Sequence, residues 1–156
     1  MAIETERKYL VDTRAWKKLK KPKGTLYTQG YIVSTEDCTL RVRLVEKKAY
    51  ITVKGKTKGM SRPEFEYEIP QKGAKDLLKT MGKGGTEKVR YKIRYKGSLW
   101  EVDVFRGDNK GLIVAEIELK TEFQQFEKPD WLREEVTHDF RYANANLAVD
   151  PYKNWK

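Results

Sequence analysis

The sequence contains almost none of the residues from which covalent cross-links and zinc sites are built. Cys38 is its only cysteine and His138 is its only histidine. One thiol cannot form a disulfide within the chain, and one thiol with one imidazole cannot supply the ligands of a structural zinc site. A disulfide framework and a Cys/His zinc site are therefore excluded, and a reducing compartment is expected.

Long apolar stretches are also missing. No N-terminal segment has the pattern of a signal peptide, and no run approaches the roughly 20 apolar residues that a membrane helix needs. We therefore expect a soluble, cytoplasmic protein with no membrane partner. The length of 156 residues and the hydrophobic content of 38% predict a single domain over residues 1–156 with a modest core.

Basic residues outnumber acidic ones, with 33 Lys and Arg against 23 Asp and Glu, and the formal net charge is +10. Such an excess favours anionic partners, because it creates a positive potential around the molecule. Phosphate compounds, nucleic acid and acidic membranes all meet this criterion. The net charge alone does not choose among them.

Alternation of apolar and polar residues recurs along most of the chain, which is the pattern of half-buried β-strands. Short connections rich in turn residues, such as 46–48, Gly97 and 107–111, indicate antiparallel hairpins. The eight predicted strands cover residues 2–9, 26–34, 38–45, 49–55, 62–70, 87–96, 98–106 and 112–120.

Short helices are predicted between and after these strands, without regular alternation. This order argues against a doubly wound parallel sheet. The fold class is therefore mainly β, an α+β arrangement of an antiparallel sheet with a few flanking helices. The helical positions are Trp16 and Leu19 behind Thr13; Ala74, Leu77, Leu78 and Met81 ahead of Gly82; Phe123 and Phe126 before Pro129; and Phe140, Ala143 and Leu147 behind Asp139.

Charged residues stand two positions apart on most of the predicted strands, which places them on one face about 6.6 Å apart. The opposite face is apolar, as in Leu40, Val42 and Leu44. The charged sets are Glu4, Glu6 and Lys8; Arg41 and Arg43; Arg62, Glu64, Glu66 and Glu68; Lys88, Arg90, Lys92, Arg94 and Lys96; Glu101 and Asp103; and Glu116 and Glu118.

An ordinary sheet with one face in water is the simplest interpretation of any one of these strands. Like charges two apart on several strands, however, repel one another unless ions of opposite sign lie between them. Clustered carboxylates suit a hard divalent cation, and paired basic residues suit a polyanion. A metal ion together with a polyphosphate satisfies both requirements.

About eight antiparallel strands can close into a barrel whose interior holds side chains or a small ligand. Unpaired charges inside such a barrel would be costly if the interior were dry. We therefore expect an eight-stranded antiparallel β-barrel with a wet, ion-filled tunnel. Its apolar outer faces would be covered by the helices.

The segment Glu4-Thr5-Glu6-Arg7-Lys8 resembles the ExExK signature of the CYTH superfamily, the triphosphate tunnel metalloenzymes, and the chain length is similar to that of the compact bacterial members. Further matching segments follow in the family's order over nearly the whole chain. They are Gln29-Gly30-Tyr31, Leu40-Arg41-Val42-Arg43, Thr52-Val53-Lys54, Ser61-Arg62-Pro63-Glu64-Phe65-Glu66, Glu87-Lys88-Val89-Arg90-Tyr91, Trp100-Glu101-Val102-Asp103-Val104-Phe105, Val114-Ala115-Glu116-Ile117-Glu118, and Glu134-Glu135-Val136-Thr137 with Arg141-Tyr142 and Asn144.

The resemblance implies a tunnel in which carboxylates bind Mg²⁺ or Mn²⁺ and basic residues bind a triphosphate. By position it gives as metal ligands Glu4, Glu6, Glu116 and Glu118, with Glu64, Glu66, Glu101 and Asp103 as further candidates around the metal. It gives as triphosphate-binding residues Lys8, Arg41, Arg43, Lys54, Arg62, Lys88 and Arg90. The remaining charged positions, expected at a tunnel mouth, are Glu68, Lys92, Arg94 and Lys96.

Lys8 and Tyr31 are the candidate catalytic residues for an in-line attack of water on a terminal phosphorus. Glu4 and Glu6 beside Lys8 keep it protonated, while surrounding Arg and Lys residues lower its pKa. Tyr31 can share a proton with Lys8 if their strands align. A metal-bound water oriented by a carboxylate is an equal alternative.

The expected activity is metal-dependent hydrolysis of a triphosphate-containing small molecule, with inorganic tripolyphosphate as the leading substrate and pyrophosphate and phosphate as products. Thiamine triphosphatase, nucleoside or RNA triphosphatase and adenylate cyclase activity remain alternatives on the same tunnel, as does a sensor without catalysis. A basic nucleic-acid-binding β-barrel is the alternative outside enzymes, although acidic pairs beside the basic residues would repel a phosphate backbone. The oligomeric state is open.

Overall fold

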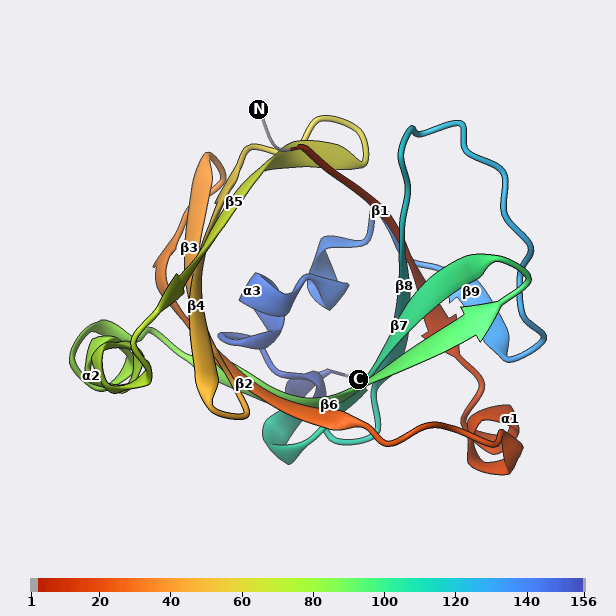
Figure 1. Cartoon of the computed structure of the whole chain (residues 1–156), viewed down its shortest axis with the longest axis horizontal. Coiled ribbons are helices and arrows are strands. Elements are labelled where there is room, and N and C mark those ends of the chain that lie inside the picture. Colours follow the sequence, from red (N-terminus) through yellow and green to blue (C-terminus); the bar gives the residue numbers. More distant parts are fainter. Residues whose placement is uncertain (1–2, 156) are drawn as a thin grey trace.

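Nine antiparallel β-strands form the frame of the computed structural model, which describes residues 3–155. Their order in the sheet is β5-β4-β3-β2-β6-β7-β8-β1-β9, and a further pairing of β5 with β1 closes the first eight into a barrel (Figure 1). The strands are β1 (Ile3–Val11), β2 (Thr25–Ser34), β3 (Cys38–Val45), β4 (Lys48–Gly55), β5 (Ser61–Ile69), β6 (Gly85–Tyr95), β7 (Ser98–Phe105), β8 (Ile113–Glu118) and β9 (Leu132–Glu135).

The eight predicted strands and their closure into a barrel are confirmed, with every described strand end within two residues of its predicted position. Ala2, at the start of the first predicted strand, lies outside the described residues. β9 was not predicted, because Leu132 is the only apolar residue of its four and no alternation marks the strand. Pairing with β1, which sets Tyr9 opposite Glu135, defines it instead.

Three short α-helices accompany the barrel within residues 3–155, and none of them is long and apolar enough to cross a membrane. Asp12 caps the first by accepting a hydrogen bond from the backbone N–H of Ala15 at 2.9 Å. The helix predicted around 140–147 is divided in two, because Ala143 has an extended backbone (φ −65°, ψ 136°). The elements are α1 (Thr13–Lys18), α2 (Gln71–Met81) and α3 (Asn144–Leu147), with 3-10 turns η1 (Gly107–Asn109), η2 (Phe140–Tyr142) and η3 (Tyr152–Asn154).

The prediction of a helix around Phe123 and Phe126 is wrong, because residues 119–131 form an irregular segment. Phe126 packs against the rings of Tyr9 and Trp100, with centroids 6.5 and 5.7 Å away, whereas Phe123 is 85% exposed. The three-residue spacing therefore separates one buried ring from one exposed ring and does not mark a helix face.

The apolar faces of the strands point out of the barrel and are covered. α2 packs on β2, β3 and β4, where Leu78 packs against the cluster of buried Val42, Ala49 and Ala74. Gly30 on β2 allows this close approach, because a Cβ at that position would lie 2.6 Å from Leu78 Cδ2. α1 and residues 119–131 cover another face through aromatic rings packed edge to face. These rings are Tyr9, Trp16, Tyr91, Trp100, Phe126 and Trp131.

Residues 136–155, the C-terminal plug, close one end of the barrel, and α3 lies across the ring of strands (Figure 1). The strand faces that are charged near the middle of the barrel become apolar at this end, where Leu10, Phe105 and Val114 project inward. Leu147 of α3 is 1% exposed and packs among these side chains. Apolar burial therefore holds the plug in place.

An ion pair outside the barrel fastens β9, and with it the start of the plug, to β1. Arg7 donates hydrogen bonds from Nε to Glu135 Oε2 at 2.8 Å and from Nη2 to Glu135 Oε1 at 2.5 Å. Hydrogen bonding from Arg7 lowers the pKa of Glu135 from 4.5 to about 2. Because this pKa is lowered by folding, the pair stabilises the fold above pH 4.5 and loses its effect as the pH falls toward 2.

We expect Glu135→Gln to lower the free energy of unfolding by about 1 kcal/mol at pH 7, since solvent screens this partly exposed pair. The difference from wild type should shrink at about pH 3, where the carboxylate contributes less. Urea unfolding at the two pH values measures both effects. Glu134→Gln is the matched control, because Glu134 forms an exposed pair with its neighbour Arg133 at 3.4 Å. Equal losses in the two variants would contradict the expectation.

Candidate active site

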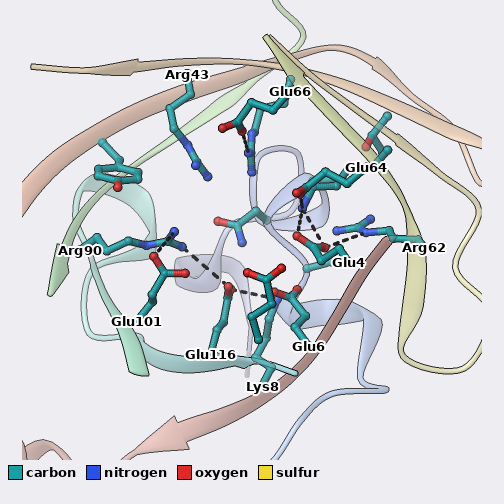
Figure 2. Close-up of a pocket in the computed structure, with 18 of the residues that line it drawn as sticks. Glu4, Glu6, Lys8, Arg43, Arg62, Glu64, Glu66, Arg90, Glu101 and Glu116 are labelled. Carbon is teal, nitrogen blue, oxygen red and sulfur yellow. Dashed lines mark hydrogen bonds and ion pairs between the residues drawn. The ribbon is translucent and has the colours of Figure 1, made fainter. Parts of the chain in front are cut away.

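A polar cavity of about 290 Å³ lies inside the barrel, and Figure 2 shows acidic and basic side chains, Glu6 and Arg43 among them, directed into it. Tyr27, Tyr31, Thr39 and residues 143–145 complete the wall. The seven basic residues are Lys8, Arg41, Arg43, Lys54, Arg62, Lys88 and Arg90, and the seven acidic residues are Glu4, Glu6, Glu64, Glu66, Glu101, Glu116 and Glu118.

The structure thus brings together every predicted site residue except Asp103. The side chains expected at a tunnel mouth are exposed and do not line this cavity; they are Glu68, Lys92, Arg94 and Lys96. The predicted convergence of the ionic strand faces on an enclosed interior is confirmed.

Asp103 lies behind the cavity wall, where it is 0% exposed. Its carboxylate accepts hydrogen bonds from Lys88 Nζ at 2.7 Å, Arg90 Nε at 2.7 Å and Arg90 Nη2 at 2.9 Å. Although burial raises it, the pKa of Asp103 is kept below its ordinary value by Arg90 and Lys88. The structure therefore places Asp103 outside the cavity lining, where it holds two of the cavity cations.

Lys88 and Arg90 respond differently to burial. Burial lowers the pKa of Lys88 to about 7, although Asp103 opposes the change. Burial also acts to lower the pKa of Arg90, but Asp103 outweighs it and the pKa lies well above its ordinary value. An anion bound in the cavity would favour the charged form of Lys88.

Arg41 and Arg43 project from β3 into the cavity. Arg41 Nη2 donates to Thr52 Oγ1 at 3.1 Å, whereas its buried Nε has no hydrogen-bond partner among residues 3–155. Arg43 Nε donates to Gln29 Oε1 at 3.0 Å. A buried guanidinium with an unused N–H is suited to bind a phosphate oxygen.

Tyr27 on β2 lies close to two guanidinium groups of the basic wall, the side of the cavity that carries Arg41, Arg43, Lys88 and Arg90. Its ring centroid is 4.8 Å from Arg43 Cζ and 5.1 Å from Arg90 Cζ, both within the range of cation–π attraction. Burial, followed by repulsion from Arg41 and Arg90, lowers the pKa of Arg43 to about 10. The wall therefore carries repulsion between cations that a bound anion would relieve.

β1 and β8 carry the acidic wall. Their register sets Glu6 opposite Glu118 and Lys8 opposite Glu116. Burial, together with Glu116 and Glu4, raises the pKa of Glu6 to about 8. Burial and Glu4 also raise the pKa of Glu118. Negative charge is thus in excess at this wall, and a bound cation would offset it.

Glu4 lies where β1 meets β5 and closes the barrel. It accepts hydrogen bonds from Lys54 Nζ at 3.1 Å and Arg62 Nε at 3.3 Å, and Lys54 Nζ is also 3.3 Å from Glu64 Oε2. Although burial raises it, the pKa of Glu4 is held well below its ordinary value by Lys54. Burial and Glu4 raise the pKa of Glu64 to about 7. Ion pairs therefore hold Glu4 in its charged form.

Lys8 and Tyr31 line different walls of the cavity, because β1 and β2 are separated by three strands in either direction around the barrel. Lys8 Nζ donates to the carbonyl of Tyr142 at 3.3 Å and lies 3.7 Å from Glu116 Oε1. The strand alignment required for proton sharing with Tyr31 is therefore absent. Although burial lowers it, the pKa of Lys8 is raised overall by Glu116 and Glu6, which favours a cation over a base.

The acidic wall offers the type of ligand atom that a divalent cation binds. Mg²⁺ and Mn²⁺ prefer oxygen ligands, and the carboxylates of Glu6, Glu116 and Glu118 face one space from two paired strands. Within residues 3–155, no three acidic, histidine or cysteine side chains are already gathered as a metal cage. Binding would therefore draw together carboxylates that lie on a common wall.

Three residues of this site were given no role from the sequence: Tyr27, Gln29 and Asn144. Tyr27 and Gln29 alternate with Tyr31 on β2, so the strand period carried a signal that they share its inward face. Asn144 has no such strand pattern, and in the sequence it stood only among the segments that resemble the family. It reaches the cavity because the plug folds back into the barrel, and strand periodicity says nothing about that contact.

The chain matches the family model described as CYTH domain over residues 2–152. It is 50% identical to the inorganic triphosphatase of Acetivibrio thermocellus, covering 100% of this chain and 99% of the relative. It is 36% identical to the inorganic triphosphatase of Nitrosomonas europaea, covering 94% and 97% of the two chains. A crystal structure of an inorganic triphosphatase, 32% identical, has a TM-score of 0.67 and covers 96% of each chain. Family model, relatives and barrel agree, and the chain belongs to the CYTH domain family.

Proposed function

We propose that the protein catalyses the divalent-metal-dependent hydrolysis of inorganic tripolyphosphate to pyrophosphate and phosphate. The observation that carries this proposal is one enclosed cavity lined by seven basic and seven acidic side chains. Two inorganic triphosphatases that align with nearly the whole chain support the same reaction.

The balance of fixed charges favours a metal ion and a polyphosphate as joint occupants of the cavity. Tripolyphosphate alone would meet the basic wall favourably but would be repelled by the acidic wall. A divalent cation bound with it supplies the opposite charge that the acidic wall lacks. A nucleic-acid strand brings only backbone negative charge, so the acidic wall disfavours it.

The carboxylates of Glu4, Glu6, Glu116 and Glu118 would hold Mg²⁺ or Mn²⁺, which supplies neutralising charge at the phosphate oxygens and a more acidic bound water. Arg41 and its neighbours on the basic wall bind the phosphate oxygens, with the guanidinium groups able to do so in pairs of hydrogen bonds.

The protein contributes mainly position and charge to the reaction. The basic wall holds the phosphate chain in line with the attacking water and stabilises the charge that develops on the leaving pyrophosphate. Lys8, kept protonated by Glu116 and Glu6, adds one cation from β1 in the acidic wall. A carboxylate of the acidic wall orients the water and accepts its proton.

The cavity wall favours an inorganic substrate over one that carries a ring. Tyr27 and Tyr31 are its only aromatic side chains in the described part of the chain. Tyr27 already lies against the guanidinium groups of Arg43 and Arg90. A nucleobase or a thiamine ring would therefore have to displace cations from Tyr27 in order to stack on it.

Phosphate release from tripolyphosphate, ATP and thiamine triphosphate, each measured with Mg²⁺ and with Mn²⁺, tests the proposal. We expect the highest kcat/KM for tripolyphosphate, loss of turnover in excess EDTA, and recovery when either metal is restored. Cyclic AMP as the dominant product from ATP, or turnover that survives chelation, would refute the assignment. Salt-sensitive RNA binding that survives chelation and the Glu4→Gln and Glu6→Gln changes would favour a nucleic-acid-binding barrel instead.

A further inference from the structure

We propose that Asn144 of the C-terminal plug is a positioning residue that orients the cations of the substrate site. The plug then completes the anion-binding wall in addition to closing the barrel. This inference rests on the proposed function, because the cations concerned are those assigned to tripolyphosphate.

A chain of hydrogen bonds links four separate elements at the inner end of the cavity. Asn144 Oδ1, at the start of α3, accepts from Lys88 Nζ on β6 and from Gln29 Nε2 on β2, both at 3.2 Å. Gln29 Oε1 accepts from Arg43 Nε on β3 at 3.0 Å. Lys88 is 0% and Gln29 is 2% exposed, so bulk water does not compete freely for these bonds.

The two cations at the ends of this chain fix the orientation of both amides. Arg43 and the protonated form of Lys88 can only donate hydrogen bonds, so Gln29 must turn its oxygen to Arg43 and Asn144 must turn its oxygen to Lys88. The amide NH₂ group of Gln29 then faces Asn144 Oδ1 and donates to it. Each of the two amides therefore has one compatible orientation, and a shift of Asn144 changes the position of both Lys88 and Arg43.

The position of Lys88 makes this link relevant to substrate binding. Its ammonium group has three donors, of which one is taken by Asp103 Oδ2 at 2.7 Å and one by Asn144 Oδ1. With both acceptors in place, the direction of the third donor is set, and Lys88 is among the residues that line the cavity. Without Asn144, the group can rotate between Asp103 and the cavity.

Kinetic and binding measurements on Asn144→Ala test this role. We expect KM for tripolyphosphate to rise about tenfold while kcat stays within about twofold, because Lys88 without a fixed direction loses the equivalent of one charged hydrogen bond to the substrate. The Kd of tripolyphosphate, measured by calorimetry without divalent metal, should rise by a similar factor. Asn146→Ala is the matched control, because Asn146 lies on the same short helix and donates from Nδ2 to the carbonyl of Arg141 at 3.2 Å.

A double-mutant cycle with Gln29→Ala separates a connected network from two independent contacts. In a network, adding Asn144→Ala to Gln29→Ala should raise KM by much less than tenfold, because Asn144 that has lost Gln29 no longer fixes the direction of Lys88. Full additivity, an unchanged KM in Asn144→Ala, an equal rise in Asn146→Ala, or a loss confined to kcat would each overturn the proposal. Wild-type protein that binds tripolyphosphate but does not hydrolyse it with metal would refute the proposed function, while the Kd values would still test the network.

Discussion

Asp103→Asn is expected to destabilise the fold by about 3 kcal/mol or more, the usual cost of removing one partner from a buried ion pair. The change keeps the shape of the side chain but removes the counter-charge of Lys88 and Arg90. These two groups are 0% and 9% exposed, so water cannot replace the lost carboxylate freely. Urea or thermal unfolding of the metal-free protein measures the loss.

Glu101→Gln is the matched control for this prediction. Glu101 stands two positions away on the same strand face and its Oε2 is 3.3 Å from Arg90 Nη1, but its side chain is 29% exposed. Solvent screening limits such a pair to about 1 kcal/mol or less. If both variants lose the same stability, burial is not what makes Asp103 important and the expectation fails.

Glu6→Gln is expected to have opposite effects on activity and on stability. Removing this proposed metal ligand should lower activity at limiting metal by about 100-fold or more, since even residues that only support metal ligands commonly account for 10–100-fold. The metal-free protein should become more stable, because burial and repulsion from Glu116 and Glu4 disfavour the Glu6 carboxylate in the folded state. A titration of activity with Mn²⁺ and a thermal unfolding curve without metal measure the two effects.

Glu68→Gln serves as the control for Glu6→Gln. Glu68 follows the same strand alternation as Glu64 and Glu66, but it lies outside the cavity with its side chain 57% exposed. Neither the metal dependence nor the stability should change appreciably in this variant. A Glu6→Gln protein that is less stable without metal, and active at unchanged metal concentrations, would show that Glu6 has a structural role only.

The two predictions differ because the two carboxylates are placed differently. Asp103 is compensated by two cations and stabilises the fold, whereas Glu6 faces other carboxylates and is retained at a cost in stability. Functional sites are where such costs are commonly found. In the acidic wall, therefore, carboxylates proposed for activity, such as Glu6, lower the stability of the fold. The ion pairs behind the basic wall stabilise the fold and also hold the cations proposed for activity.

The sequence by itself determined the eight strands of the barrel, their inward and outward faces, and the family. The alternation in segments such as Leu40-Arg41-Val42-Arg43 is a local property, because successive side chains of any strand point to opposite faces. It therefore indicated correctly which charged residues would share the interior. It was also sufficient to expect that α2 would cover an apolar outer face.

Only the tertiary structure decided which of these residues touch. Barrel closure placed Lys8 and Tyr31 on strands with three others between them, set Asp103 behind Lys88 and Arg90, and brought Asn144 back from the chain end to join Gln29. These contacts join residues far apart in the chain, and they depend on strand order, register and the docking of the plug. No local period encodes such distances, because they result from the packing of the whole barrel.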